Sequence, residues 1–148
     1  MTIRLADKFD IPQIFEMLRH YRDAGIVSGV NEITNEETPM RLMTHILAGA
    51  GLAIVSEKDK KLTGMLLALK TPLLWDMSKF VMSEIAYWVE PSDRNTTTGY
   101  RLINEYTDIC NVMVKTKQIT KYTITQLEGQ SLNYGRFGFK PIETTWSS

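Results

Sequence analysis

The chain has 148 residues, of which 43% are apolar, and its 17 lysines and arginines balance its 17 aspartates and glutamates. This size predicts one domain, residues 1–148, with its own core, and the zero net charge argues against nucleic acid as the main partner, because nucleic-acid binding normally needs a basic surface. A single cysteine, Cys110, excludes an intrachain disulfide, and without a signal-peptide pattern or a long apolar run we expect a cytoplasmic protein outside the membrane.

The N-terminal segment predicts a strand followed by a helix. Residues 2–5 form a short segment typical of a strand. Asp10 is placed to cap the helix that follows, with Gln13 reaching back to complete a capping box. Gly25 is typical of a helix end. His20 lies among polar neighbours on this helix, and we expect it to face solvent.

The next segment predicts a second helix and two strands. Thr38 precedes a proline, a pattern typical of an N-cap and a first helical turn. Apolar residues then recur at helical spacing until Gly49 or Gly51. Residues 52–56 and 62–69 have the apolar runs of strands, with a charged turn between them.

Residues 71–80 interrupt the strands with an unusually apolar connection that includes Trp75. Two interpretations stay open for it. The connection is either a satellite of the core or a lid over a binding site, where exposed aromatic side chains would select an apolar partner.

The segment from Ser83 to Met113 is the most informative part of the chain. Residues 83–89 alternate as a strand, and residues 102–113 have the apolar spacing of an amphipathic helix. The polar loop between them, from Arg94 to Gly99, precedes the helix N-terminus, where free N–H groups and the helix dipole favour an anion. The segment predicts a phosphate or pyrophosphate site, although a simple capped junction would have the same pattern.

Two motifs resemble the GNAT family of N-acetyltransferases. The loop is similar to the family's pyrophosphate loop, Q/R-x-x-G-x-G/A, with Arg94 in the first position, Gly99 in the last, and Thr97 where the first glycine is usual. Threonine at that position is expected to narrow the conformations of the loop. Near the C-terminus, Tyr134, Gly138 and the phenylalanine after it match the family's Tyr-x-x-x-Gly-Phe segment.

The resemblance implies a mixed-sheet α/β fold with the order β-α-α-β-β-β-α-β-α-β and a shortened C-terminus. Residues 122–127 would form the fifth strand, parallel to the fourth and splayed from it, and residues 140–146 a last strand. Family members commonly add one further strand, so its absence leaves a sheet edge exposed. We expect a second copy of the chain to cover this edge, which would make the protein a homodimer.

By the same resemblance, the chain is an N-acetyltransferase that moves an acetyl group from acetyl-CoA directly to a primary amine of an unidentified acceptor. Tyr134 would give a proton to the departing thiolate. Backbone N–H groups at Trp88 and Val89 would hold the pantetheine, and those from Asn95 to Tyr100 the pyrophosphate, with Arg94 assisting. The expected acetyl-CoA contacts are thus Trp88, Val89, Arg94, Asn95, Thr96, Thr97, Thr98, Gly99 and Tyr100.

The general base is expected to be Glu84, on the fourth strand, whose pKa burial would raise toward a useful value. Glu90 and Glu128 are reserve candidates. No metal is expected, because the two histidines, His20 and His45, are distant and lie in no cysteine or carboxylate cluster. Two alternatives remain: a catalytically inactive GNAT-fold binding or assembly protein, and a binder of another phosphate ligand such as a nucleotide.

Overall fold

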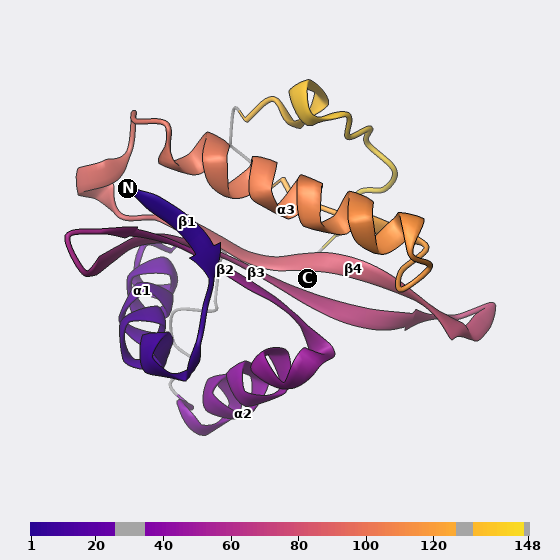
Figure 1. The fold of residues 1–148 in the computed structure, drawn as a ribbon, viewed down its shortest axis with the longest axis horizontal. Coiled ribbons are helices and arrows are strands. Elements are labelled where there is room, and N and C mark those ends of the chain that lie inside the picture. The colour runs from indigo at the N-terminus through magenta and orange to yellow at the C-terminus, as the bar shows by residue number, and fades with distance from the viewer. Residues whose placement is uncertain (26–34, 127–131, 147–148) are drawn as a thin grey trace.

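The computed structural model describes residues 1–25, 35–126 and 132–146. Within these ranges, five strands form a single sheet, three α-helices pack on it, and there are four short helical turns (Figure 1). The strands are β1 (Thr2–Leu5), β2 (Gly51–Lys58), β3 (Lys61–Leu73), β4 (Asp76–Val89) and β5 (Lys121–Thr123). The helices are α1 (Ile11–Asp23), α2 (Glu37–His45) and α3 (Thr98–Lys115), and the turns are η1 (Lys8–Asp10), η2 (Ile46–Ala50), η3 (Pro91–Asp93) and η4 (Tyr134–Phe137).

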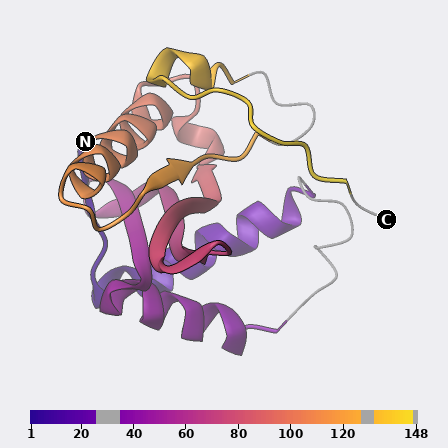
Figure 2. The same ribbon diagram turned by 90° about the vertical axis from the view of Figure 1, so that its right-hand side faces the viewer.

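The sheet follows chain order, β1-β2-β3-β4-β5, and among the described strands the β4–β5 pair is parallel while the other pairs are antiparallel. Helices α1 and α2 cover one face, and α3 covers the other (Figures 1 and 2). Each face has its own apolar core: Ile14, Met17 and Met43 pack toward the first, and Leu102 and Tyr106 toward the second. The expected mixed-sheet α/β fold class is confirmed.

The first helix is capped three residues earlier than predicted. The capping box consists of Asp7 and Asp10, and it closes the turn η1 that precedes α1. Gln13 instead accepts a hydrogen bond from the backbone N–H of Leu62 at 2.9 Å, so it joins α1 to β3. Asp10 is buried and accepts two hydrogen bonds, of 2.7 and 2.9 Å, from Arg4 of β1. A charged side chain therefore links the first strand to the first helix.

The second helix also begins earlier than its sequence pattern indicates. Asn35, rather than Thr38, supplies the capping oxygen, which accepts a hydrogen bond from the N–H of Glu37 at 2.9 Å. The end is as predicted, because α2 continues into η2, where Gly49 has a φ of 109°. Most of the loop before α2 lies outside the described residues.

The prediction of an irregular connection over residues 71–80 is wrong. β3 continues to Leu73 and β4 already begins at Asp76, so the two strands form a long hairpin with only a short tip. At the tip, Leu74 is 77% and Trp75 is 90% exposed. The tip lies at the end of the sheet away from the loop before α3 (Figure 1). The exposed tip residues are therefore not part of the core, and their role as a lid over a binding site stays a prediction.

The C-terminal part is less regular than predicted. β5 spans Lys121–Thr123 rather than residues 122–127, of which residue 127 is not described. No strand forms over residues 140–146, so the last strand of the predicted order is absent from the described part of the chain. β5 is then the edge strand on this side, and the homodimer through this edge stays a prediction. Gly138, with a φ of 89°, ends the turn η4 in the left-handed region, which explains the glycine of the Tyr-x-x-x-Gly-Phe segment.

Candidate active site

β4 and β5, at one edge of the sheet, separate from each other as predicted. They pair only over three positions, from Val81 with Lys121 to Ser83 with Thr123. The next residue of β4, Glu84, uses its side chain instead: its carboxylate accepts a hydrogen bond from the backbone N–H of Thr125 at 3.1 Å. β4 itself bulges here, because Ala68 faces Glu84 while Leu67 faces Ala86, which leaves Ile85 as the extra residue. The two strands therefore open toward the end of β4.

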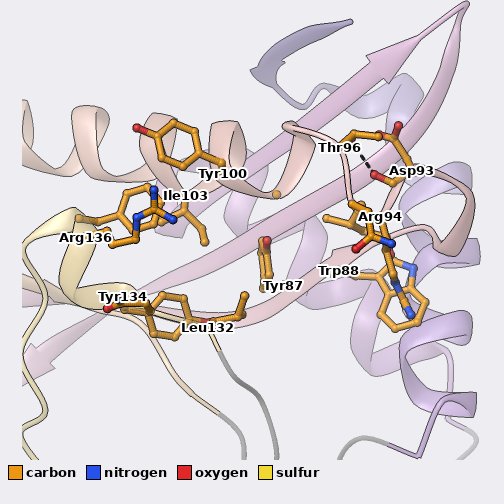
Figure 3. Close-up of a pocket in the computed structure, with 15 residues that line it drawn as sticks. Tyr87, Trp88, Asp93, Arg94, Thr96, Tyr100, Ile103, Leu132, Tyr134 and Arg136 are labelled. Atoms are coloured by element: carbon orange, nitrogen blue, oxygen red, sulfur yellow. Dashed lines mark hydrogen bonds between the residues drawn. The ribbon is translucent and has the colours of Figure 1, made fainter.

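A cavity of about 450 Å³ lies beside the end of β4, bounded by the loop after it, the first turns of α3 and the turn η4 (Figure 3). Its walls are mainly aromatic and polar side chains. They belong to Tyr87, Trp88, Val89, Asp93, Arg94, Asn95, Thr96, Gly99, Tyr100, Ile103, Leu132, Asn133, Tyr134, Arg136 and Phe137. The cavity thus joins the two sequence motifs, which lie about forty residues apart in the chain.

The loop before α3 accommodates threonine where the family pattern has glycine. Thr97 has a φ of −82° and a ψ of −2°, the ordinary right-handed region, so this position does not require glycine. The left-handed residue of the loop is Asn95, with a φ of 63°, and asparagine tolerates this region better than most residues. The expected narrowing of the loop by Thr97 therefore produces no backbone strain at this position.

Hydrogen bonds inside the loop use two of its three threonine hydroxyls. The hydroxyl of Thr96 donates to the backbone carbonyl of Asp93 at 2.7 Å. The hydroxyl of Thr98, which is fully buried, donates to the carboxylate of Asp93. These bonds hold the turn η3 against the start of α3. The hydroxyls of Thr96 and Thr98 are therefore already engaged within the loop.

Arg94 is held in place from two sides. Its Nε donates to the backbone carbonyl of Val89 at 2.9 Å, and its guanidinium carbon lies 4.5 Å from the ring centroid of Trp88. Within the described residues, no carboxylate forms an ion pair with it. A guanidinium oriented through Nε keeps its two terminal nitrogens available, and these form the fork that suits a phosphate oxygen pair.

Gly99 lets the first turn of α3 approach β4 closely. A Cβ at this position would lie 2.4 Å from the hydroxyl oxygen of Tyr87, well inside contact distance. Burial raises the pKa of Tyr87 to about 12, so this hydroxyl keeps its proton at neutral pH. The last glycine of the loop motif is therefore required by packing against Tyr87.

The two predicted catalytic side chains meet at one residue. Thr125 donates its N–H to Glu84, and its carbonyl accepts a hydrogen bond from the hydroxyl of Tyr134 at 3.2 Å. Burial raises the pKa of Glu84 to about 7, against the opposing effect of the hydrogen bonds from Thr125. Burial, together with the nearby charge of Glu84, also raises the pKa of Tyr134. The carboxyl group of Glu84, whose pKa lies near neutrality, and the protonated phenol of Tyr134 are thus both hydrogen-bonded to Thr125.

Most of the predicted site residues line the cavity, and three do not. Those that line it are Trp88, Val89, Arg94, Asn95, Thr96, Gly99, Tyr100 and Tyr134. Thr97, Thr98 and Glu84 lie outside the lining, and Glu84 is buried with its carboxylate bonded to the N–H of Thr125. The sequence reasoning did not select Tyr87, Asp93 or Arg136 as site residues. Arg136 could have been found, because it lies inside the Tyr-x-x-x-Gly-Phe segment.

His20 and Glu90 form a pair on the other side of Trp88. Nδ1 of His20 lies 2.8 Å from a carboxylate oxygen of Glu90, and both residues border a second hollow that also contacts Arg94. His20 is exposed, as expected, but it has this partner.

Across the described ranges, no three histidine, cysteine or acidic side chains gather closely enough to hold a metal ion. None of the described helices is long and apolar enough to span a membrane. Glu128 lies outside the described residues.

The structure is similar to those of solved acetyltransferases. A predicted acetyltransferase from Clostridium acetobutylicum, solved with acetyl-CoA, matches with a TM-score of 0.74 and 16% identity over 99% of this chain and 94% of that chain. An aminoglycoside 6'-N-acetyltransferase from Acinetobacter haemolyticus matches with a TM-score of 0.68 and 16% identity over 100% and 97% of the two chains. Glucosamine-6-phosphate N-acetyltransferase from Arabidopsis thaliana matches with a TM-score of 0.70 and 15% identity over 99% and 96%.

No protein-family model and no curated protein matches the sequence. At this low identity the similarity establishes the fold: the chain has the fold of the GNAT acetyltransferases, and the resemblance seen in the sequence is confirmed at that level.

Proposed function

We propose that the protein is an acetyl-CoA-dependent N-acetyltransferase that transfers the acetyl group directly to a primary amine of an acceptor still to be identified. The observation that carries the proposal is the position of Glu84 and Tyr134. They lie where β4 and β5 separate and share Thr125 as a hydrogen-bond partner, and Tyr134 also lines the cavity beside the N-terminus of α3. The acetyl-CoA bound in the C. acetobutylicum structure supports the same co-substrate for this fold.

The cavity suits the coenzyme at the end where Arg94 lies. The first backbone N–H groups of α3 have no partner inside the helix, and the helix dipole adds partial positive charge there. Arg94 adds a full charge with two free terminal nitrogens. We assign the pyrophosphate of acetyl-CoA to this end, with the N–H groups from Asn95 to Tyr100 as donors. The N–H groups of Trp88 and Val89, at the end of β4, would hold the pantetheine and polarise the thioester carbonyl.

Direct transfer needs a base for the amine and an acid for the thiolate. The amine nitrogen attacks the thioester carbonyl, the carbon–sulfur bond breaks, the amine gives up one proton, and the sulfur takes one. Glu84 is the proposed base, either directly or through a water molecule, since its pKa of about 7 leaves it partly ionised at neutral pH. Tyr134 is the proposed acid. In the free protein its hydroxyl donates to Thr125, and it would redirect this proton to the sulfur.

Calorimetric titration with CoA and acetyl-CoA tests the binding step. The wild type should bind both with micromolar affinity, and Arg94→Ala should weaken binding about tenfold, because it removes charge-assisted hydrogen bonds to phosphate. Arg101→Ala is the matched control, since Arg101 is an exposed arginine of α3 that does not line the cavity. Absence of binding at millimolar coenzyme would overturn the proposal.

A screen of amine acceptors tests the chemical step. With an active acceptor, Tyr134→Phe should lower kcat about a hundredfold while KM stays within about twofold, as expected for a proton donor that acts only in the transition state. The alternative is a catalytically inactive binding protein of the same fold, which the absence of a strand over residues 140–146 favours. That alternative predicts coenzyme binding without turnover for any acceptor.

A further inference from the structure

A second arginine without an acidic partner lies on the cavity. Arg136 belongs to η4, is exposed, and lines the cavity on the side opposite Arg94 (Figure 3). The arginines Arg4, Arg19, Arg22 and Arg41 each form an ion pair with a carboxylate, whereas no carboxylate among the described residues pairs with Arg136. Its guanidinium is therefore free to bind an anion that enters the cavity.

Aromatic rings lie beside this arginine. Tyr100 of α3 and Phe137 of η4 both line the cavity, and their ring centroids are 5.1 Å apart at an interplanar angle of 42°. Tyr100 is 54% exposed, so part of its ring remains available. Exposed aromatic faces bind nucleobases by stacking, and an adjacent guanidinium binds a phosphate on the same nucleotide. This group of Arg136, Tyr100 and Phe137 has the chemistry of a nucleotide subsite.

The proposed co-substrate carries two separate phosphate groups, a pyrophosphate in the middle and a 3'-phosphate on the ribose of its adenosine end. Arg94 and the start of α3 account for the first. We propose that Arg136 binds the 3'-phosphate, with the adenine against Tyr100 and Phe137, and that Arg136 thereby makes the protein select CoA over 3'-dephospho-CoA. The inference rests on the proposed function, and it adds a residue that decides which form of the coenzyme is accepted.

Arg94 and Arg136 both line the cavity without an ion-pair partner among the described residues. An arginine in an ion pair would have to give up its carboxylate before it could bind a phosphate, which would reduce the gain in affinity. Arg94 and Arg136 carry no such cost. They lie on opposite sides of the cavity (Figure 3), an arrangement that offers one cationic group to each of two anionic groups on a ligand.

Calorimetric titrations with CoA and with 3'-dephospho-CoA test the proposal. The two ligands differ only in the 3'-phosphate, so the wild type should bind CoA about tenfold more tightly, the effect of a charge-assisted hydrogen bond. Arg136→Gln should weaken CoA binding about tenfold and change dephospho-CoA binding less than about twofold. Tyr100→Ala should weaken both ligands by the same factor, because both carry the adenine.

Arg101→Gln controls for the general loss of one positive charge near α3 and should leave the ratio of the two affinities unchanged. If the wild type binds CoA and dephospho-CoA equally, the subsite is refuted while the proposed function stands. The same holds if Arg136→Gln weakens both ligands alike, or if it affects only an anionic acceptor. If neither coenzyme binds the wild type, the proposed function itself fails, so the two failures are distinguishable.

Discussion

Replacing Glu84 by glutamine should remove a large part of the pH dependence of stability. Burial raises the pKa of Glu84 from an ordinary value of 4.5 to about 7 in the folded protein. The folded state therefore holds this proton more tightly than the unfolded state. The stabilisation is complete below the unfolded pKa and is lost as the pH rises through the folded pKa, so the free energy of unfolding should fall between about pH 4.5 and pH 7 and stay level above.

The size of the fall follows from the two pKa values. Each unit of difference corresponds to about 1.4 kcal/mol, so the whole shift amounts to about 3 kcal/mol. The side chain is only 8% exposed, so solvent screening takes little away. Glutamine has nearly the same shape as protonated glutamate, and its side-chain oxygen can still accept the N–H of Thr125. The variant should therefore match the wild type at low pH and be more stable by about 3 kcal/mol at about pH 8.

Urea denaturation of both proteins across this pH range measures the difference directly. Other groups whose pKa folding shifts, such as Asp10, are present in both proteins, so their contributions cancel in the comparison. The reasoning about Glu84 is refuted if the difference in unfolding free energy between the two proteins stays constant within about 0.5 kcal/mol from pH 4.5 to pH 8. In that case Glu84 titrates like an exposed carboxylate and is a poor candidate for the base.

Three further substitutions test the packing around the site and the fold. Asp10→Asn should cost about 2 kcal/mol in urea denaturation, because it removes the buried negative charge that faces Arg4 and one of its two acceptor oxygens, and a loss below about 0.5 kcal/mol would mean that this pair adds nothing. Gly99→Ala should cost about 1–3 kcal/mol through contact with the hydroxyl of Tyr87, and the loss should vanish in the Tyr87→Phe background, where the next ring atom lies 3.7 Å from the new Cβ. Equal losses in both backgrounds would exclude this contact as the reason for the glycine. Trp75→Ser should change stability by less than about 0.5 kcal/mol, since the side chain is 90% exposed; a larger loss would indicate that another molecule covers the hairpin tip.

The sequence was sufficient for the elements whose pattern depends on burial. The strand before the loop and the amphipathic helix α3 follow from apolar periodicity, the parallel arrangement of β4 and β5 was implied by the family resemblance, and the structure contains all three. Tertiary contacts decide the details that were missed. Asp7 and Asp10 before the first helix, and Asn35 and Thr38 before the second, are all good capping residues. Which residue caps each helix depends on where the neighbouring chain turns. Local patterns contain no information about that choice.

The long β3–β4 hairpin shows a second limit of sequence reasoning. Residues 71–80 contain proline and several large apolar side chains, so they lack the alternation expected of a half-buried strand. They are strands because the two chains continue to pair with each other beyond the body of the sheet, with Pro72 opposite Phe80. A ribbon that extends into solvent has little burial on either face. Burial is the source of the periodic signal, so the signal disappears where the hairpin leaves the core.

The loop before α3 shows that a family pattern records backbone geometry only indirectly. A glycine in such a pattern is needed where φ is positive or where another group approaches closely. Here the positive φ belongs to Asn95, and the close approach belongs to Gly99, so Thr97 has neither requirement. The substitution of threonine for the usual glycine therefore does not by itself argue for an inactive protein. What remains to separate an enzyme from a binding protein is the chemistry of Glu84 and Tyr134, which is why the pH dependence of Glu84 is the most informative property of the site.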